Sequence, residues 1–347
     1  MLFILVSVSA FSYSKCDDKY LSVDLKCLVF LLIFIPSAIR VNIGTDYVNY
    51  LGYFNSFAIT GNSFFEMGWT VLESIILELG LHYQWLFVIS SFLIFIWFLF
   101  IDKKYFFPTI SIFFLYFYTF SYNGVRNSIS VMLFFLSYIY LIKNKKLKGF
   151  LFVLAGTLFH SSAWLCVLIY LLMSFVKLSK KKTLIIAFII YIVFFKFQLA
   201  QKFLDSSFLG ATKYAKYAAS LTYNKTSVIS TGFGVLLRHF VLFFTYCLTS
   251  EKKVSKREFS AMSILFLSLL IADILATQIY AFGRLRVIFS VAYMAMFVNL
   301  YSWKSKNIFI EIGKFCSFLY SFLFVFVLGL LANQNEIVPY TSMIGVW

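Results

Sequence analysis

Charged and tyrosine side chains between residues 40 and 69 interrupt a chain that is otherwise built of apolar runs. The side chains able to do chemistry there are Arg40, Asp46, Tyr47, Tyr50, Tyr53 and Glu66. A carboxylate next to a hydroxyl group can accept its proton, so Asp46 and Glu66 are candidate general bases. The alternative is that either one forms a salt bridge with Arg40. Tyrosines can stack on sugar rings, and Tyr47 and Tyr50 are candidate substrate-binding residues.

His160 is a third candidate base. It lies within an apolar run and is followed by Ser161 and Ser162. Imidazole titrates near neutral pH and is the side chain most often used for proton transfer. A lone histidine in an apolar run is also commonly a structural group, and both interpretations stay open.

Five arginines form the second candidate set: Arg40, Arg126, Arg238, Arg284 and Arg286. Arg238 lies about two turns inside an apolar run, where an arginine costs at least ~2.5 kcal/mol at the membrane centre and usually faces a site. The planar guanidinium suits phosphate or carboxylate, so the set predicts an anionic ligand. The structural alternative is that these arginines hold helices together by pairing with acidic residues, namely Asp46, Glu66, Glu73 or Asp273.

The composition predicts the elements that position these residues. Of the 347 residues, 62% are hydrophobic and 13% are charged, with a mean hydropathy of +0.89, whereas soluble domains are about 25% charged. We therefore expect an all-α, polytopic integral membrane protein that forms a single domain over residues 1–347. The net charge of +16 does not indicate nucleic-acid binding, because the basic residues fall in short clusters between apolar runs.

The apolar runs predict about 12 membrane segments of the length that a bilayer requires. They are residues 1–14, 21–39, 83–101, 106–122, 127–142, two arms within 147–177, 183–199, 232–249, 259–279, 285–301 and 308–331. Residues 67–81 contain two glutamates and are expected at the membrane interface. The positive-inside rule places the lysine clusters in the cytoplasm. The loops at about 40–67 and 200–231, with the candidate arginines, then lie on the outer side.

The run from 147 to 177 is too long for one span and too short for two. Lysine clusters flank it at both ends, so both ends are expected in the cytoplasm. Two arms of about 14 residues reach roughly 21 Å into a core about 30 Å thick. The turn near His160 then stops short of the far face, which predicts a cavity open to the outside with His160 at its floor.

Several functions are disfavoured by missing motifs. The chain has no Walker loop, GxGxxG, HExxH or GxSxG sequence, which argues against ATP-driven transporters, metalloproteases and hydrolases. The cysteines have no metal-ligand spacing and are expected to be small core residues.

The order of the motifs resembles the EpsG-like branch of the Wzy polysaccharide polymerases. The matching residues are Arg40, Gly44-Thr45-Asp46-Tyr47, Tyr50, Glu66-Met67-Gly68-Trp69, Arg126, Leu158-Phe159-His160-Ser161-Ser162-Ala163, Arg284, Arg286 and Val338-Pro339-Tyr340. One departure is Ser128 and Ser130, where the family pattern is rich in alanine. The resemblance covers about residues 40–340.

The resemblance implies a glycosyltransferase of the GT-C-like kind in the bacterial inner membrane. Such an enzyme joins oligosaccharide repeat units carried on undecaprenyl pyrophosphate at the periplasmic face, giving O-antigen or capsular or exopolysaccharide. It implies that no metal or other cofactor takes part and that a chain-length regulator protein is a possible partner. In this hypothesis Arg126, Arg238, Arg284 and Arg286 bind the pyrophosphate, Arg40 has no settled role, and His160 is the leading base.

Other functions remain as alternatives. A flippase for lipid-linked oligosaccharide also needs a cationic cavity, but its charges are expected along a central path. An O-antigen ligase or a membrane acyltransferase using the His160 region is a further alternative. A purely structural membrane scaffold would leave the arginines unexplained.

Overall fold

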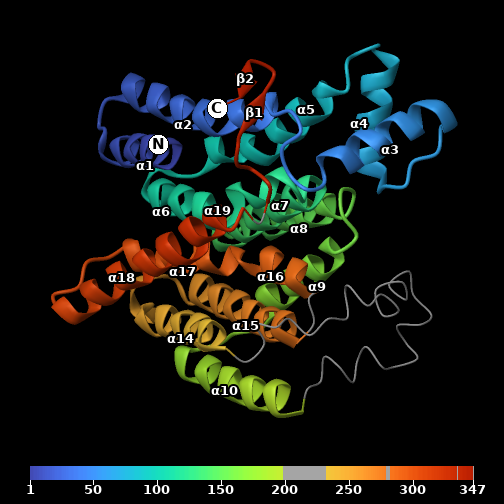
Figure 1. The fold of residues 1–347 in the computed structure, drawn as a ribbon. Helices are drawn as coiled ribbons and strands as arrows, with labels where there is room; N and C mark the ends of the chain where they lie inside the picture. Colours follow the sequence, from blue (N-terminus) through green and yellow to red (C-terminus); the bar gives the residue numbers. More distant parts are fainter. Residues whose placement is uncertain (198–231, 279–281, 334, 347) are drawn as a thin grey trace. The chain divides into compact units, whose positions relative to one another are not determined.

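The computed structural model describes residues 1–197, 232–278, 282–333 and 335–346, and most of these residues are helical (Figure 1). The predicted outer loop at 200–231 lies outside the described residues. The chain divides into two compact units, which we describe separately. Unit 1 comprises Met1–Tyr170 and Phe318–Trp347, and unit 2 comprises Leu171–Ser317.

Unit 1 is built around the buried helix α7 (Val125–Ile142), which packs against α8 (Lys146–Gly156) and α5 (Gln84–Phe95). Its other elements are α1 (Leu2–Lys15), α2 (Lys19–Ile39), α3 (Tyr47–Thr60), α4 (Met67–Glu78), η1 (Ile96–Phe100), α6 (Lys103–Phe113), η2 (Phe114–Tyr118), η3 (Phe120–Tyr122), η6 (Ser321–Val327), α19 (Leu328–Leu331), β1 (Thr341–Ser342) and β2 (Gly345–Val346). Helix α9 (Ala163–Phe175) begins in this unit.

Unit 2 is built around α15 (Lys256–Gln278), which contacts α10, α14, α16 and α17. The elements of this unit are α10 (Lys180–Phe197), α14 (Phe233–Leu248), η4 (Glu251–Lys253), α16 (Gly283–Phe289), α17 (Val291–Tyr301) and the first part of α18 (Ile308–Tyr320). Most side chains of α15 and α17 are buried. These two helices therefore form the core of the unit.

Five helical stretches in the described residues are long and apolar enough to cross a membrane: Lys19–Ile39, Val125–Ile142, Lys256–Thr277, Gly283–Tyr301 and Ile308–Leu331. The all-α, multi-pass membrane character predicted from composition is confirmed. The predicted total of about 12 segments stays a prediction, because several other apolar helices are shorter than a full span.

The predicted pair of short arms is present as α8 and α9, which have 11 and 13 residues. At 1.5 Å per residue they are roughly 17–20 Å long, shorter than the ~30 Å hydrocarbon core. Residues 157–162 connect them by turns, and His160 lies in this connection. The sequence therefore placed His160 correctly between two arms.

Helix α3 is an element that the sequence analysis missed, because it treated residues 40–67 as a loop. The helix contains Asn49, Gly52 and Asn55, all of which are poor helix formers. Its end is marked by Gly61, which adopts a left-handed conformation with φ of 68°. Burial of Tyr47, Tyr50 and Phe54 on one face stabilises it, which is a tertiary effect.

The C-terminal segment crosses the end of α2 (Figure 1). This contact joins two parts of unit 1 that are far apart in the sequence. Val41 N–H donates to the Thr341 carbonyl at 3.1 Å, and Met343 N–H donates to the Ile39 carbonyl at 3.0 Å. The Tyr340 hydroxyl donates to the Pro36 carbonyl. We call residues 335–346 the C-terminal strap, since they hold the loop that follows α2.

Candidate functional site

Three segments of unit 1 meet at the side chain of Glu66, which ends the loop before α4. Its Oε2 pairs with Nη1 of Arg126, in the first turn of α7. Its Oε1 accepts a hydrogen bond of 2.9 Å from the Ser161 backbone N–H, in the connection between α8 and α9. The structure thus brings together the Glu66, Arg126 and His160 motifs, which lie far apart in the sequence.

Gly68 lets α4 approach the connection between α8 and α9. Its N–H donates to the Leu158 carbonyl at 2.7 Å. A Cβ at this position would lie 2.8 Å from that same carbonyl oxygen, so any larger residue would push the two segments apart. The glycine of the Glu66-Met67-Gly68-Trp69 motif is therefore required for close packing.

Arg126 is largely buried, with 18% of its side chain exposed. Its guanidinium carbon lies 3.9 Å from the centre of the Phe65 ring, a cation–π contact. Its Nε–H is buried and makes no hydrogen bond with the described part of the chain. The ring and the Glu66 carboxylate fix the guanidinium in place, and its Nε–H is buried without a partner in the described chain.

The environment of Glu66 favours the carboxylate. Burial by itself opposes ionisation, but the Arg126 guanidinium and the Ser161 N–H outweigh it and hold the pKa of Glu66 below its ordinary value of 4.5. A carboxylate with a lowered pKa and two occupied oxygens is a poor proton acceptor. The geometry therefore favours Glu66 as a residue that positions Arg126 and the His160 connection.

His160 forms a local pair with Ser162. Its Nδ1 lies 2.6 Å from the Ser162 hydroxyl oxygen and accepts from the Ser162 N–H at 3.2 Å. A nitrogen that accepts from a backbone N–H carries no proton, so the neutral ring has its proton on Nε2. The Ser162 hydroxyl then donates to Nδ1, and the pair can take up a proton through the hydroxyl oxygen.

Asp46 precedes α3, and its carboxylate makes no ion pair or hydrogen bond among the residues that the structure describes. It is half-buried and close enough to Tyr50 to interact electrostatically. Asp46 therefore remains a candidate proton acceptor. Tyr47 and Tyr50, predicted to bind substrate, are buried instead: Tyr47 stacks on Phe87 at 4.5 Å, and Tyr50 packs on Trp69 at 5.2 Å.

Arg40 is enclosed, with 1% of its surface exposed. Its guanidinium carbon lies 4.9 Å from the Phe87 ring and 4.8 Å from the Tyr122 ring, and Nη1 donates to the Ser37 hydroxyl at 3.2 Å. Its Nε and Nη2 make no hydrogen bond within the described ranges. The C-terminal strap pairs with the Arg40 backbone. This arrangement favours a structural role for Arg40.

Unit 2 contains a separate cationic cluster around the buried carboxylate of Asp273, on α15. The Arg238 Nε lies 2.9 Å from Asp273, the His239 Nε2 lies 3.2 Å away, and the Arg286 Nη1 lies 3.8 Å away. Arg284 is exposed and has no acidic partner among the described residues. One carboxylate thus faces two arginines, which leaves an excess of positive charge.

The structure brings some of the predicted site residues together and leaves others apart, and Tyr50, whose side chain interacts with Arg126, lies next to the first group. Glu66, Arg126 and His160 come together in unit 1, Arg238 and Arg286 come together in unit 2, and the remaining residues are Arg40, Asp46, Tyr47, Tyr50 and Arg284. The expected acidic pairing of arginines occurs at Arg126, Arg238 and Arg286. The sequence-based candidates include neither Phe65 nor His239, although His239 directly follows Arg238. Among the described residues, no group of His, Cys, Asp and Glu could hold a metal ion.

Comparison with known proteins adds the family. No curated protein sequence and no solved structure matches the chain significantly. The family model described as the EpsG family matches residues 24–342. This range includes every motif described above and ends within the C-terminal strap. The chain therefore belongs to the EpsG family, whose members are membrane polysaccharide polymerases of the Wzy type, enzymes that act on lipid-linked oligosaccharides.

Proposed function

We propose that this protein is a glycosyltransferase that joins undecaprenyl-pyrophosphate-linked repeat units into O-antigen or capsular or exopolysaccharide at the periplasmic face of the bacterial inner membrane. The observation that carries the proposal is the cluster of Glu66, Arg126 and the 160–162 connection. It joins an anion-binding donor to a candidate proton acceptor. Family membership supplies the reaction class.

The proposed reaction forms one glycosidic bond and breaks one bond to pyrophosphate. A hydroxyl oxygen of the incoming unit attacks the anomeric carbon at the reducing end of the growing chain. The bond from that carbon to the lipid pyrophosphate breaks, and the pyrophosphate leaves with the electron pair. The hydroxyl proton passes to His160 through the Ser162 hydroxyl. Asp46 is the alternative acceptor, because its carboxylate has no ion-pair partner in the described chain.

The arginines are proposed to stabilise the negative charge that develops on the pyrophosphate. Arg126 is held by Glu66 and Phe65 and retains an unpaired Nε–H within the described structure. In unit 2, Asp273 fixes Arg238 and Arg286, and Arg284 is exposed beside Arg286 in sequence. We propose that these side chains make the reaction independent of metal ions. Activity of the purified protein is then expected to persist with excess EDTA.

The proposed architecture is GT-C-like, with about 12 membrane segments and the site open to the periplasm. The short arms α8 and α9 support it, because a connection between arms of 11 and 13 residues ends at membrane depth. A chain-length regulator protein is a proposed partner, because formation of glycosidic bonds does not by itself determine how many repeat units are joined.

The test is a gel of surface polysaccharide from the host lacking this gene. Complementation uses the intact chain, Arg126→Ala, Arg284→Ala or, as a matched control, Arg257→Ala from the predicted cytoplasmic cluster. We expect gene loss to leave single repeat units, the intact chain and Arg257→Ala to restore a ladder, and the other two variants to fail.

Two results would contradict the proposal. Loss of all surface units on gene deletion would favour the flippase or ligase alternative, because export or attachment would then be blocked. Full ladders from both Arg126→Ala and Arg284→Ala would exclude these arginines from the pyrophosphate site. Membrane levels of each variant, measured by immunoblot, separate loss of activity from loss of protein.

A further inference from the structure

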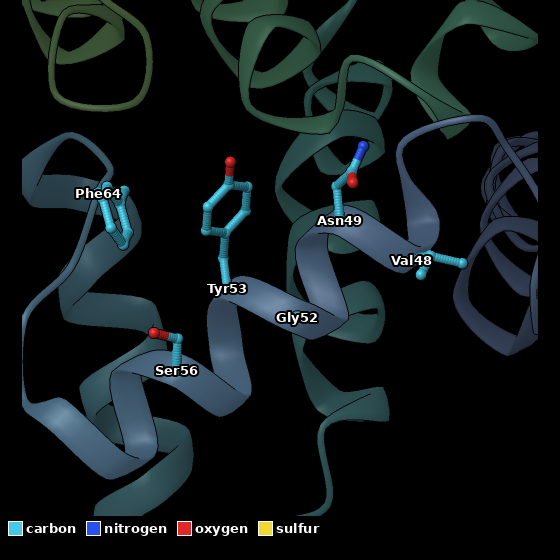
Figure 2. A pocket seen from close by; sticks show the side chains of 6 residues that line it. All are labelled: Val48, Asn49, Gly52, Tyr53, Ser56 and Phe64. Atoms are coloured by element: carbon cyan, nitrogen blue, oxygen red, sulfur yellow. The ribbon is translucent and has the colours of Figure 1, made fainter.

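A surface groove runs along α3 and the loop that follows it, outside the Glu66 cluster. It has a volume of about 270 Å³. Figure 2 shows Asn49, Tyr53 and Ser56 projecting from α3, with the Phe64 ring beside them on the loop. The remaining lining residues are Val48 and Gly52.

The spacing of residues gives α3 two different aromatic faces. Tyr47, Tyr50 and Phe54 repeat at three and four residues and are buried. Asn49, Tyr53 and Ser56 repeat at the same spacing on a different face of the helix, which is less buried. Tyr53 is therefore the aromatic side chain that α3 exposes at the surface. It lies about one turn after Tyr50, which packs in the core.

The groove combines the groups that recognise a sugar. The Asn49 amide and the Ser56 hydroxyl make no hydrogen bond with the part of the chain that the structure describes, so both remain available to ligand hydroxyls. Tyr53 offers a ring and a hydroxyl and is 42% exposed. Gly52 has no atom within 4 Å of where a Cβ would stand, which lets a ligand approach the helix backbone.

Ring contacts connect the groove to the Glu66 cluster. The Tyr53 ring lies 5.5 Å from Phe64 and 4.9 Å from Phe65. Phe65 in turn carries the Arg126 guanidinium on its face at 3.9 Å and directly precedes Glu66. A ligand in the groove would therefore be held two side chains away from the proposed pyrophosphate-binding arginine.

We propose that this groove is a saccharide subsite, in which Tyr53 stacks on one pyranose ring of the oligosaccharide and Asn49 and Ser56 bind its hydroxyls. The volume is slightly below the ~300–1,000 Å³ of pockets for drug-sized ligands, so it suits one or two sugar rings of a repeat unit. This inference rests on the proposed function, because polymerisation brings such rings to the site.

The test fills the groove without disturbing the fold. Gly52 is helical and no atom lies within 4 Å of its Cβ position, so Gly52→Leu can begin a side chain there and fill the groove. Tyr53→Ala removes the ring and Tyr53→Phe keeps it. Gly329→Leu on α19 is the matched control, because Gly329 also has no atom within 4 Å of its Cβ position. Thermal unfolding of each purified variant confirms that it is folded.

The probe is the repeat-unit oligosaccharide freed from its lipid by mild acid, prepared from the host lacking this gene. Binding to the full chain in detergent is measured by saturation-transfer NMR. We expect Gly52→Leu and Tyr53→Ala to weaken binding about tenfold, the size of one good aromatic contact. Tyr53→Phe and Gly329→Leu are expected to bind like the wild type, and the first two variants to give shorter ladders.

The two hypotheses fail in different ways. If gene loss does not remove the ladder, the proposed function is wrong. If gene loss removes the ladder but Gly52→Leu and Tyr53→Ala bind the oligosaccharide and polymerise like the wild type, the saccharide subsite alone is wrong. Absence of any binding by the wild-type chain, with a normal ladder in the host, also overturns the subsite.

Discussion

At the scale of single residues, Glu66 organises the site by using each carboxylate oxygen for a different segment. One oxygen holds Arg126 and the other holds the Ser161 N–H. Neither partner is near Glu66 in the sequence, so the carboxylate fixes the distance between α7 and the His160 connection. A change that keeps the size of Glu66 but removes its charge should disturb both neighbours.

The strength of the ion pair is measurable by a double-mutant cycle of Glu66→Gln and Arg126→Gln. The pair is about four-fifths buried, since 18% and 22% of the two side chains are exposed. We expect a coupling free energy of about 1–3 kcal/mol, between the values of surface and fully buried pairs. Urea unfolding of the purified variants gives the coupling. A value near zero would mean that the contact does not contribute to stability.

The lowered pKa of Glu66 predicts a pH dependence of stability. The folded-state pKa lies below the ordinary 4.5, so the stabilisation is fully present above pH 4.5 and is lost as the pH falls through the folded pKa. The difference in unfolding temperature between the wild type and Glu66→Gln should be constant from pH 7 to 5 and shrink at lower pH. A difference that grew on acidification would contradict the assignment.

At the scale of elements, the connection between α8 and α9 is held from two sides. Gly68 of α4 contacts the Leu158 carbonyl, and Ser130 of α7 donates its hydroxyl to the Gly156 carbonyl at 2.7 Å. Ser130 is one of the departures from the family pattern, and here it satisfies a carbonyl at the end of α8. The serine therefore supports the position of the His160 connection.

Gly68→Ala should separate α4 from this connection. The added Cβ would lie 2.8 Å from the Leu158 oxygen, so we expect a loss of about 1–3 kcal/mol in stability and a strong reduction in polymer length. Gly329→Ala, at a position with open space, serves as the control. Unfolding midpoints and polysaccharide gels measure the two effects. Normal ladders from Gly68→Ala would show that the close approach is unnecessary for activity.

At the scale of the whole chain, the C-terminal strap gives unit 1 hydrogen bonds between residues that are far apart in the sequence. The Tyr340 and Thr341 side chains bond to the Pro36 and Val41 carbonyls, 304 and 300 residues away. The strap lies beside the backbone of Arg40, whose guanidinium is enclosed by rings. The backbone around Arg40 is thus held by a distant part of the sequence.

Met343→Pro tests the strap, because proline removes the N–H that donates to the Ile39 carbonyl at 3.0 Å. The Met343 side chain is 62% exposed, so Met343→Ala is a control that keeps the N–H. We expect faster hydrogen exchange at residues 39–44 in the proline variant only. Equal exchange in both variants would mean that the strap does not protect this loop.

Sequence reasoning succeeded where a local signal was present. Lysine clusters at both ends of 147–177 revealed the two arms, and the charged motifs marked Glu66, Arg126 and His160. It failed where tertiary contacts determine the helix or the burial of a side chain. Helix α3 has poor local propensity, and the burial of Tyr47 and Tyr50 depends on the phase of that helix. The enclosure of Arg40 depends on rings from two other elements, those of Phe87 and Tyr122.

The strap also fixes an order of events during synthesis. At ~5–20 residues per second, the ribosome reaches Thr341 roughly 15–60 s after Val41. Throughout that interval the backbone around Arg40 lacks the partners that the strap supplies, among them the Thr341 carbonyl that accepts from the Val41 N–H. Chains stalled on the ribosome before residue 335 should therefore show faster hydrogen exchange at the Val41 N–H than released chains.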